Sequence, residues 1–365
     1  MNILVTGMTS LQVNPKRRPI RKIDVPEAMV NGLEAMGHSV NWCRWSLTYN
    51  DAAMNYYDLA IIGLSYVQSW SGRYGLQALY AVEQLRRLNK PFVIFFDDWQ
   101  IEKFYGEIAW TRKNYKKQFY KKLGDGTLFH TETGGHDFRW VKKREKDILS
   151  AMDFLLTDLS GSRAVALCPM YNFGKPELFH GYLKMKPKNI YTIDPTPAVI
   201  DMTEIKRSAP ARSNGWLLAS LSPQDKWAEG LQLDWPVTYV GAKKIGAPRL
   251  KTEEDVRELY KTHVGVLAPP YPHVGSGWFR SRFVYAALHH CVLYGHHLDL
   301  ETFYGIGFDP HEFEKCGPRI QRGIAKAQRE SVLDRMNTMK GFYADLDAVV
   351  RGAKLRRVRK GNTNG

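Results

Sequence analysis

Two neighbouring carboxylates, Asp97 and Asp98, follow an apolar run, residues 91–96, that is typical of a buried strand. A carboxylate at a strand end is suited to accept a proton from an attacking hydroxyl group. The chain then enters residues 103–122, where aromatic rings alternate with the cations Lys103, Arg112, Lys113, Lys116, Lys117, Lys121 and Lys122. Cations can neutralise phosphates while rings stack on bases, so the pattern predicts a catalytic carboxylate beside a nucleic-acid groove. The alternative interpretation is a solvated amphipathic helix with a structural acid at its head.

The charge balance of the whole chain points to a polyanionic partner. Among the 365 residues, 52 Lys and Arg stand against 37 Asp and Glu, which gives a net charge of +15 at pH 7. The excess is concentrated in residues 103–122, 139–146 and 354–360, as in nucleic-acid-binding proteins. Membrane surfaces also attract basic chains, but no apolar run is long enough for a spanning helix and the N-terminus lacks a signal-type core. We therefore expect a soluble, intracellular protein with no membrane partner.

Cysteines and histidines show no spacing that is typical of a metal site. Cys43, Cys168, Cys291 and Cys316 stand alone, which fits a reducing compartment, and we interpret them as small buried hydrophobic residues. One crowded segment contains His289, His290, Cys291, His296 and His297. It straddles a predicted helix end and the next strand, without standard ligand spacing. We therefore predict no metal site.

A parallel sheet must position the carboxylate pair. Along the first half of the chain, short apolar strands alternate with segments of helical periodicity. The predicted strands are residues 2–7, 39–45, 59–64, 92–96 and 154–157, and the predicted helices are residues 25–36 and 76–88. Such alternation is typical of an α/β domain with a parallel sheet.

A polar, breaker-rich segment, residues 207–215, predicts a hinge to a second α/β domain. Strands recur after it at residues 216–220, 237–240 and 264–267, and a chain of this length exceeds the usual limit of one core. Residues 323–350 are mostly helix-forming, with apolar positions that would pack back across both domains. The predicted boundaries are 1–206 and 207–325 for the two domains, 326–352 for the returning helix and 353–365 for a basic disordered tail.

Small-residue turns in the second domain predict a diphosphate site. The loop at Gly7 lacks the G-x-G-x-x-G spacing of dinucleotide-binding domains, which argues against a nicotinamide-dependent dehydrogenase. No Walker lysine motif occurs either. The turns instead offer Ser220, Ser222, Lys226, Gly241, Gly277, Arg280 and Arg282. Exposed amides, helix N-termini and cations suit a diphosphate. Each turn alone is also compatible with an ordinary glycine turn, but together they favour a nucleotide-diphosphate site.

The chain resembles the bacteriophage DNA β-glucosyltransferases, which have the two-domain glycosyltransferase fold called GT-B. The resemblance covers most of both predicted domains. Its motifs are Met8 and Val13-Asn14 in the first loop, then residues 57–62, 96–98, 220–222, 237–241 and 279–287. It implies two Rossmann-like, doubly wound domains that face each other across a cleft. The first would bind DNA and the second the nucleotide sugar.

The resemblance also implies an activity and its site. The family transfers glucose from UDP-glucose to the hydroxymethyl group of a modified pyrimidine in double-stranded DNA, with inversion at the sugar carbon. The family's general base falls on Asp98, and Asp97 is our second choice because neighbouring side chains of a strand point to opposite faces. A monomer in the cytoplasm of the infected host cell is expected. The donor-binding set comprises Gly7, Ser220, Ser222, Lys226, Gly241, Gly277, Arg280, Arg282 and Tyr285.

One position departs from the family. Tyr285 stands where such enzymes usually have a glutamate that holds the ribose hydroxyls, and a tyrosine can bond only one hydroxyl well. A divalent ion, Mg²⁺ or Mn²⁺, would assist the departing UDP without protein ligands. Two alternatives stay open: a GT-B enzyme acting on a small molecule, lipid or protein, and a noncatalytic DNA-binding protein on the same scaffold.

Overall fold

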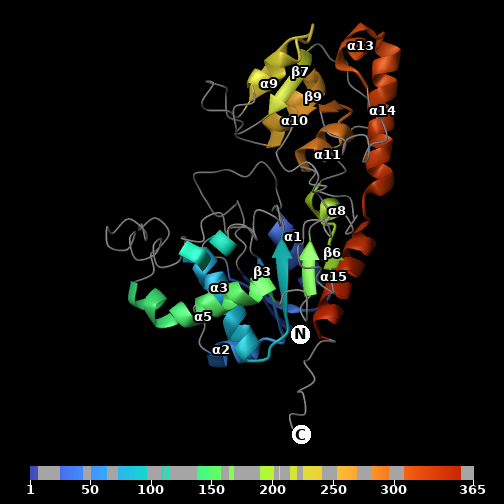
Figure 1. Ribbon diagram of the computed structural model, residues 1–365. Coiled ribbons are helices and arrows are strands. Elements are labelled where there is room, and N and C mark those ends of the chain that lie inside the picture. The colour runs from blue at the N-terminus through green and yellow to red at the C-terminus, as the bar shows by residue number, and fades with distance from the viewer. Residues whose placement is uncertain are drawn as a thin grey trace.

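Two parallel β-sheets organise the protein, each covered by helices (Figure 1). The structure is a computed structural model. It describes residues 1–6, 25–43, 51–63, 73–96, 108–110, 112–114, 138–157, 164–167, 190–200, 205, 214–219, 225–240, 253–268, 281–295 and 308–354. The predicted hinge, apart from its last two residues, and the tail beyond residue 354 lie outside these ranges. Within them, no helix combines the length and apolar character needed to cross a membrane.

The first sheet has six strands in the order β2-β1-β3-β4-β5-β6, all in parallel pairs. Its strands are β1 (Asn2–Thr6), β2 (Ser39–Cys43), β3 (Leu59–Gly63), β4 (Phe92–Phe96), β5 (Ala164–Leu167) and β6 (Ile190–Thr192). β3 is buried along its whole length, which explains its uninterrupted apolar sequence, because helices cover both faces of a parallel sheet.

The second sheet has four parallel strands in the order β10-β9-β7-β8. They are β7 (Asn214–Ala219), β8 (Val237–Val240), β9 (His263–Ala268) and β10 (Val292–Gly295). On the edge strand β10, Leu293 donates its N–H to Gln328 Oε1 (2.8 Å) and accepts a bond from Gln328 Nε2 (3.1 Å). The side chain of Gln328 is buried, so this amide takes the position of a strand partner.

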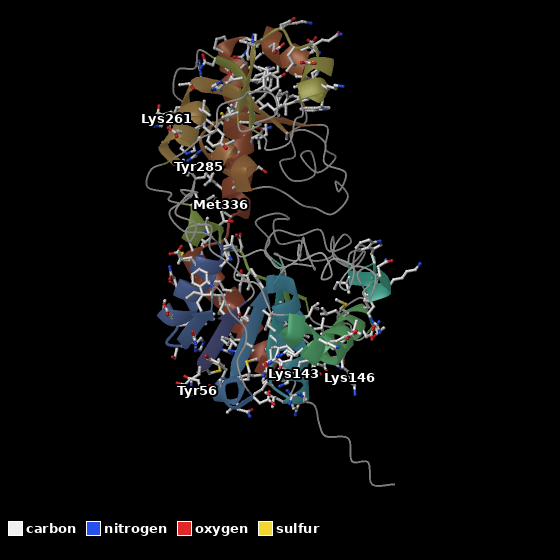
Figure 2. The ribbon with its side chains drawn as sticks, turned by 90° about the vertical axis from the view of Figure 1, so that its left-hand side faces the viewer. Tyr56, Lys143, Lys146, Lys261, Tyr285 and Met336 are labelled. Atoms are coloured by element: carbon white, nitrogen blue, oxygen red, sulfur yellow. The ribbon has the colours of Figure 1, made fainter. Side chains whose placement is uncertain are left out.

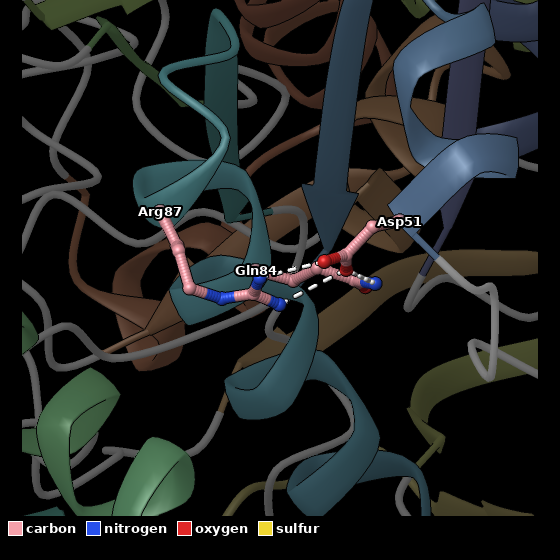
Figure 3. A network of polar contacts seen from close by, with 3 residues as sticks. All are labelled: Asp51, Gln84 and Arg87. Atoms are coloured by element: carbon pink, nitrogen blue, oxygen red, sulfur yellow. Dashed lines mark hydrogen bonds and ion pairs between the residues drawn. The ribbon is translucent and has the colours of Figure 1, made fainter.

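Helices α1 (Val25–Ala35), α2 (Asp51–Tyr56), α3 (Arg73–Arg87), α5 (Phe138–Thr157) and α8 (Thr196–Val199) belong to the first sheet. α2 and α3 are joined by a carboxylate that accepts three bonds (Figure 3). The Asp51 carboxylate accepts from Arg87 Nη1 (2.6 Å) and Nη2 (2.9 Å), and from Gln84 Nε2 (2.8 Å). The hydrogen bond from Arg87 lowers the pKa of Asp51. These bonds fix α2 to the last turn of α3.

Helices α9 (Asp225–Gly230), α10 (Glu253–Thr262), α11 (Ser281–Leu288) and α13 (Pro310–Lys315) surround the second sheet. Aromatic rings fill part of its core, with Trp216 centred 5.7 Å from Phe313 and 6.3 Å from Trp235. The buried Glu314 carboxylate accepts from Trp216 Nε1 (2.7 Å), Trp235 N (3.1 Å) and Asp234 N (2.8 Å). The buried indole N–H of Trp216 therefore has an acceptor, and the same carboxylate also satisfies the two backbone N–H groups.

The C-terminal segment returns across both sheets, as predicted, but as two helices. α14 (Pro318–Arg335) packs against α11 and β10, and α15 (Met339–Lys354) packs against α1, α8 and strands of the first sheet (Figure 1). The helices separate at Met336, whose ψ of 136° is extended. Gly32 lets α15 approach α1 closely, because a Cβ atom there would lie 2.6 Å from Leu346 Cδ1.

The predicted strand at residues 154–157 is wrong, because these residues form the last turn of α5. Ile148, Met152 and Leu155 are fully buried and recur at intervals of four and three residues, which is the period of a helix. The short strands β5 and β6 were not predicted. They are only four and three residues long, so each offers few residues from which to judge a period.

Candidate functional site

The predicted base lies directly beyond a central strand. β4 pairs with β3 on one side and β5 on the other, and Val93, Ile94 and Phe95 are fully buried. Asp97 and Asp98 follow the last residue of this strand, at the edge where all carboxyl ends of the sheet meet. Both aspartates lie outside the described residues, so their roles stay predictions. The sheet fixes only the point from which they start.

Gly7 occupies the corresponding point after β1. β1 pairs with β2 on one side and β3 on the other, so the strand order reverses there. Such a reversal is where doubly wound sheets leave room for ligands. Gly7 itself lies outside the described residues, and its predicted contact with the donor stays a prediction.

The turns of the predicted donor site start from neighbouring strands. Ala219 of β7 and Val240 of β8 are register partners, so the turns that begin at Ser220 and Gly241 leave the sheet side by side. Lys226 is exposed near the start of α9. Ser220, Ser222 and Gly241 lie outside the described residues. The structure thus brings the origins of the two turns together, as a shared ligand would require.

The remaining donor residues of the second domain lie on helix α11 or shortly before it in the sequence. Arg282 is in its first turn, where the backbone is described but the side chain is not, and Gly277 and Arg280 precede the described helix. Tyr285, labelled in Figure 2, is half-buried on α11. Its ring centroid lies 4.9 Å from that of His289 and 6.1 Å from that of Tyr260. The ring therefore packs between α11 and α10, which fixes its orientation.

The cluster of histidine and cysteine belongs to the core at the end of α11. His289, His290 and Cys291 are buried, and the thiol of Cys291 lies 3.2 Å from the carbonyl oxygen of Tyr260. His296 and His297 lie outside the described residues. In the described ranges, no three His, Cys, Asp or Glu side chains are grouped to hold a metal ion. Cys291 is buried as predicted, whereas Cys316 is only half-buried.

The described part of the basic segment is tied to α5. Arg112 donates from Nε to Asp153 Oδ1 (2.7 Å) and from Nη2 to Asp153 Oδ2 (2.9 Å). This hydrogen bonding raises the pKa of Arg112 and lowers the pKa of Asp153. Lys113 is exposed. The other predicted DNA contacts, Lys103, Lys116, Lys117, Lys121 and Lys122, lie outside the described residues.

A polar junction that we did not predict joins the segment after β6 to the segment between α14 and α15 and to α15 itself. Asp194, between β6 and α8, donates its N–H to Asp345 Oδ2 (3.1 Å) and accepts from Asn337 N (3.2 Å). Asn337 also donates from Nδ2 to Asp345 Oδ2 (2.8 Å). Burial raises the pKa of both carboxylic acids. The partners are far apart in the sequence, so no local pattern signals them.

Comparison with known proteins identifies the fold. Neither a protein-family model nor a curated protein matches the sequence. The structure is similar to the DNA-modifying enzyme β-glucosyltransferase, solved with and without its substrate uridine diphosphoglucose: the TM-score is 0.52 at 11% identity over 97% of this chain and 99% of that one. This chain has the GT-B glycosyltransferase fold. The structure is also similar to that of T4 phage BGT in complex with its UDP-glucose substrate. The TM-score is again 0.52, at 10% identity over 97% of this chain and 99% of that one.

Proposed function

We propose that the protein is an inverting glycosyltransferase that moves a sugar, glucose from UDP-glucose, onto the hydroxymethyl group of a modified pyrimidine in double-stranded DNA. The observation that carries the proposal is the correspondence, over nearly the whole of both chains, with a β-glucosyltransferase described as a DNA-modifying enzyme. The net charge of +15 supports a polyanionic acceptor. The aspartates beyond β4 supply the chemistry that this reaction needs.

The acceptor requires a base, because a primary hydroxyl is a poor nucleophile at neutral pH. In the proposed mechanism, the carboxylate of Asp98 accepts the hydroxyl proton while the oxygen attacks the anomeric carbon from the face opposite UDP. The bond from the sugar to the diphosphate breaks in the same displacement. One displacement inverts the configuration, so an α-configured donor gives a β-linked product without a covalent intermediate.

The departing diphosphate requires positive charge. We assign this role to Lys226, Arg280 and Arg282, with amides of the turns at Ser220 and Gly241 as further donors. The adjacency of β7 and β8 supports this assignment, because it starts both turns at one place on the sheet. A divalent ion such as Mg²⁺ on the diphosphate would add to the same stabilisation.

Mass spectrometry of nucleosides tests the proposal directly. Duplexes containing hydroxymethylcytosine, hydroxymethyluracil or neither are incubated with the protein and UDP-glucose, UDP-galactose or UDP-N-acetylglucosamine, then digested. We expect one modified nucleoside to gain the mass of one sugar, and unmodified DNA to gain none. Failure of every modified duplex to react, with transfer of the sugar to a small hydroxylated acceptor instead, would overturn the DNA assignment.

A further inference from the structure

The short segment around Arg112 has a buried side and an exposed side. Ile108 is fully buried, whereas Trp110 is 53% exposed and Lys113 is also exposed. Asn114 donates from Nδ2 to the carbonyl oxygen of Trp110 (2.8 Å). The pair between Arg112 and Asp153 attaches this segment to α5. An apolar anchor and an ionic anchor therefore hold the segment while a ring and a cation face outward.

Helix α5 continues this surface with two lysines. Lys142 and Lys146 are both exposed, and they precede Asp153 by about three and two helical turns. At 3.6 residues per turn, both side chains leave the helix within about 20° of the direction of Asp153. Arg144 lies on another side, with its guanidinium carbon 5.0 Å from the ring centroid of Tyr80 on α3. The lysines therefore occupy the side of α5 on which Arg112 docks.

Lys142, Lys146 and the attachment point at Asp153 lie along one side of α5, which we call the lysine stripe. Its length can be compared with the spacing of phosphates in DNA. Lys142 and Asp153 are separated by about 16 Å along the helix axis. Phosphates of one strand of duplex DNA recur every ~3.4 Å along its axis, so the stripe spans about five base pairs. Figure 2 labels Lys146 and its neighbour Lys143 on α5.

We infer that Trp110, Lys113, Lys142 and Lys146 form one DNA-contacting surface, and that Arg112 is a positioning residue that holds its two parts together through Asp153. The inference rests on the proposed DNA acceptor. The edge of the guanidinium formed by Nε and Nη2 is occupied by a carboxylate. The pair is neutral as a whole, so its attraction for phosphate is small, whereas its effect on the position of Trp110 and Lys113 is direct.

The variant Asp153→Asn distinguishes a positioning role of the pair between Arg112 and Asp153 from a simple effect of charge on DNA binding. A nearby negative charge repels DNA, so electrostatics alone predicts tighter binding by Asp153→Asn. Loss of the attachment predicts the opposite, and we expect affinity for a fluorescent, unmodified 20-base-pair duplex to fall several-fold. Binding is measured by anisotropy without UDP-sugar, so the result is independent of the transfer assay. Tighter binding by Asp153→Asn would overturn the positioning role.

Exchanging the two charges provides the matched control. Arg112→Asp alone should bind DNA at least tenfold more weakly, and Arg112→Asp combined with Asp153→Arg should return to within a few-fold of the native affinity. The net charge of the exchanged protein equals that of the native chain, and thermal unfolding checks that each variant is folded. An exchanged protein as weak as Arg112→Asp would show that Arg112 itself contacts the DNA.

The salt dependence of binding tests the lysine stripe. Lys142→Gln with Lys146→Gln should reduce the slope of log affinity against log salt by roughly 0.9 for each phosphate that the variant no longer neutralises. Lys340→Gln, an exposed lysine on α15 away from α5, should leave the slope unchanged. An equal slope for the double variant and the native protein would overturn the surface. Sugar transfer to modified DNA, measured separately, reports on the proposed function.

Discussion

The two sheets are closed by different kinds of contact from consecutive C-terminal helices. α15 covers the first sheet with apolar side chains, and Phe342, Leu346 and Val349 join one buried cluster with its strands. α13 and α14 also add apolar groups to the second sheet. In addition, Glu314 of α13 accepts a hydrogen bond from the indole of Trp216, and Gln328 of α14 accepts one from the backbone of Leu293. Apolar contact is non-directional, whereas hydrogen bonds require particular atoms. The domain of the first sheet should therefore tolerate the exchange of one apolar side chain for another at this contact. The domain of the second sheet should not tolerate the loss of its hydrogen-bonding side chains.

The largest effect is expected from Asp98→Asn, which tests whether the general base is supplied by the domain of the first sheet. Asparagine nearly preserves volume but cannot accept the hydroxyl proton. Transfer should fall by roughly two to four orders of magnitude, with UDP affinity and DNA binding unchanged.

Transfer is measured by product formation, and UDP binding by calorimetry. Asp97→Asn serves as the matched control and should have a milder effect. NMR of the native enzyme's product should show a β-linkage. Near-normal turnover by Asp98→Asn, or an α-linked product, would contradict an inverting mechanism with this base.

The difference between the two kinds of contact predicts losses of stability of different size for substitutions in the two domains. Phe342→Leu keeps an apolar group and should reduce the free energy of unfolding by about 1.5 kcal/mol or less. Glu314→Ala leaves the buried indole N–H of Trp216 without its acceptor and also removes the acceptor of the partly buried N–H groups of Asp234 and Trp235, so it should reduce this free energy by about 2 kcal/mol or more.

Glu314→Gln keeps the volume but presents an amide to one of the three donors, so it should lie between these values. Denaturant unfolding measures all three variants. Equal losses for Phe342→Leu and Glu314→Gln would remove the contrast between the two halves.

Binding of the diphosphate should depend mainly on residues of the second domain. Arg282→Ala should weaken UDP binding by about 1.5–3 kcal/mol, the range for a hydrogen bond to a charged group, as measured by calorimetry. Lys113→Ala, on the first half, is the control and should leave UDP affinity unaltered. If Arg282→Ala bound UDP normally, the donor site would have to be placed elsewhere.

The smallest effect is expected at the junction of Asp194, Asn337 and Asp345. Burial raises the pKa of both carboxylic acids, so their contribution to stability is present below the unfolded value of about 3.8 and is lost as pH rises through the folded pKa. Ionisation of these two adjacent carboxyl groups therefore opposes folding.

Asp345→Asn keeps an acceptor oxygen for Asp194 N and Asn337 Nδ2, and removes one charge. We expect unchanged or slightly raised stability at pH 7, by up to about 1 kcal/mol, and a smaller gain on acidification than in the native protein. Asp345→Ala removes the acceptor as well and should destabilise by about 1–3 kcal/mol. Thermal unfolding between pH 4.5 and 7 measures these changes. A marked loss of stability of Asp345→Asn at pH 7 would contradict the prediction that the charge of Asp345 opposes folding.

Strands with long apolar runs could be predicted from the sequence, and polar contacts between distant residues could not. The run at residues 92–96 predicted β4 with its correct limits, because burial on both faces demands an unbroken apolar sequence. Residues 154–157 were misinterpreted because a short apolar run fits either period, and the basic turns of α5 before it obscured the helix.

The site was predictable to a similar extent. Its strand ends follow from the sheet, since β7 and β8 are neighbours and β4 is central. The bond between Arg112 and Asp153 joins residues 41 positions apart, and that between Asp194 and Asp345 joins residues 151 apart. Only the folded chain brings such partners together, so local spacing carried no sign of either.

The amide of Gln328 has a consequence for the protein at high concentration. An edge strand offers unpaired N–H and C=O groups on which another chain can add a strand, and this is a common start of aggregation. Leu293 turns both of its groups out of β10, and Gln328 occupies both. Through Gln328, α14 therefore occupies part of the β10 edge of the second sheet and leaves fewer groups there on which another copy of the chain could add a strand.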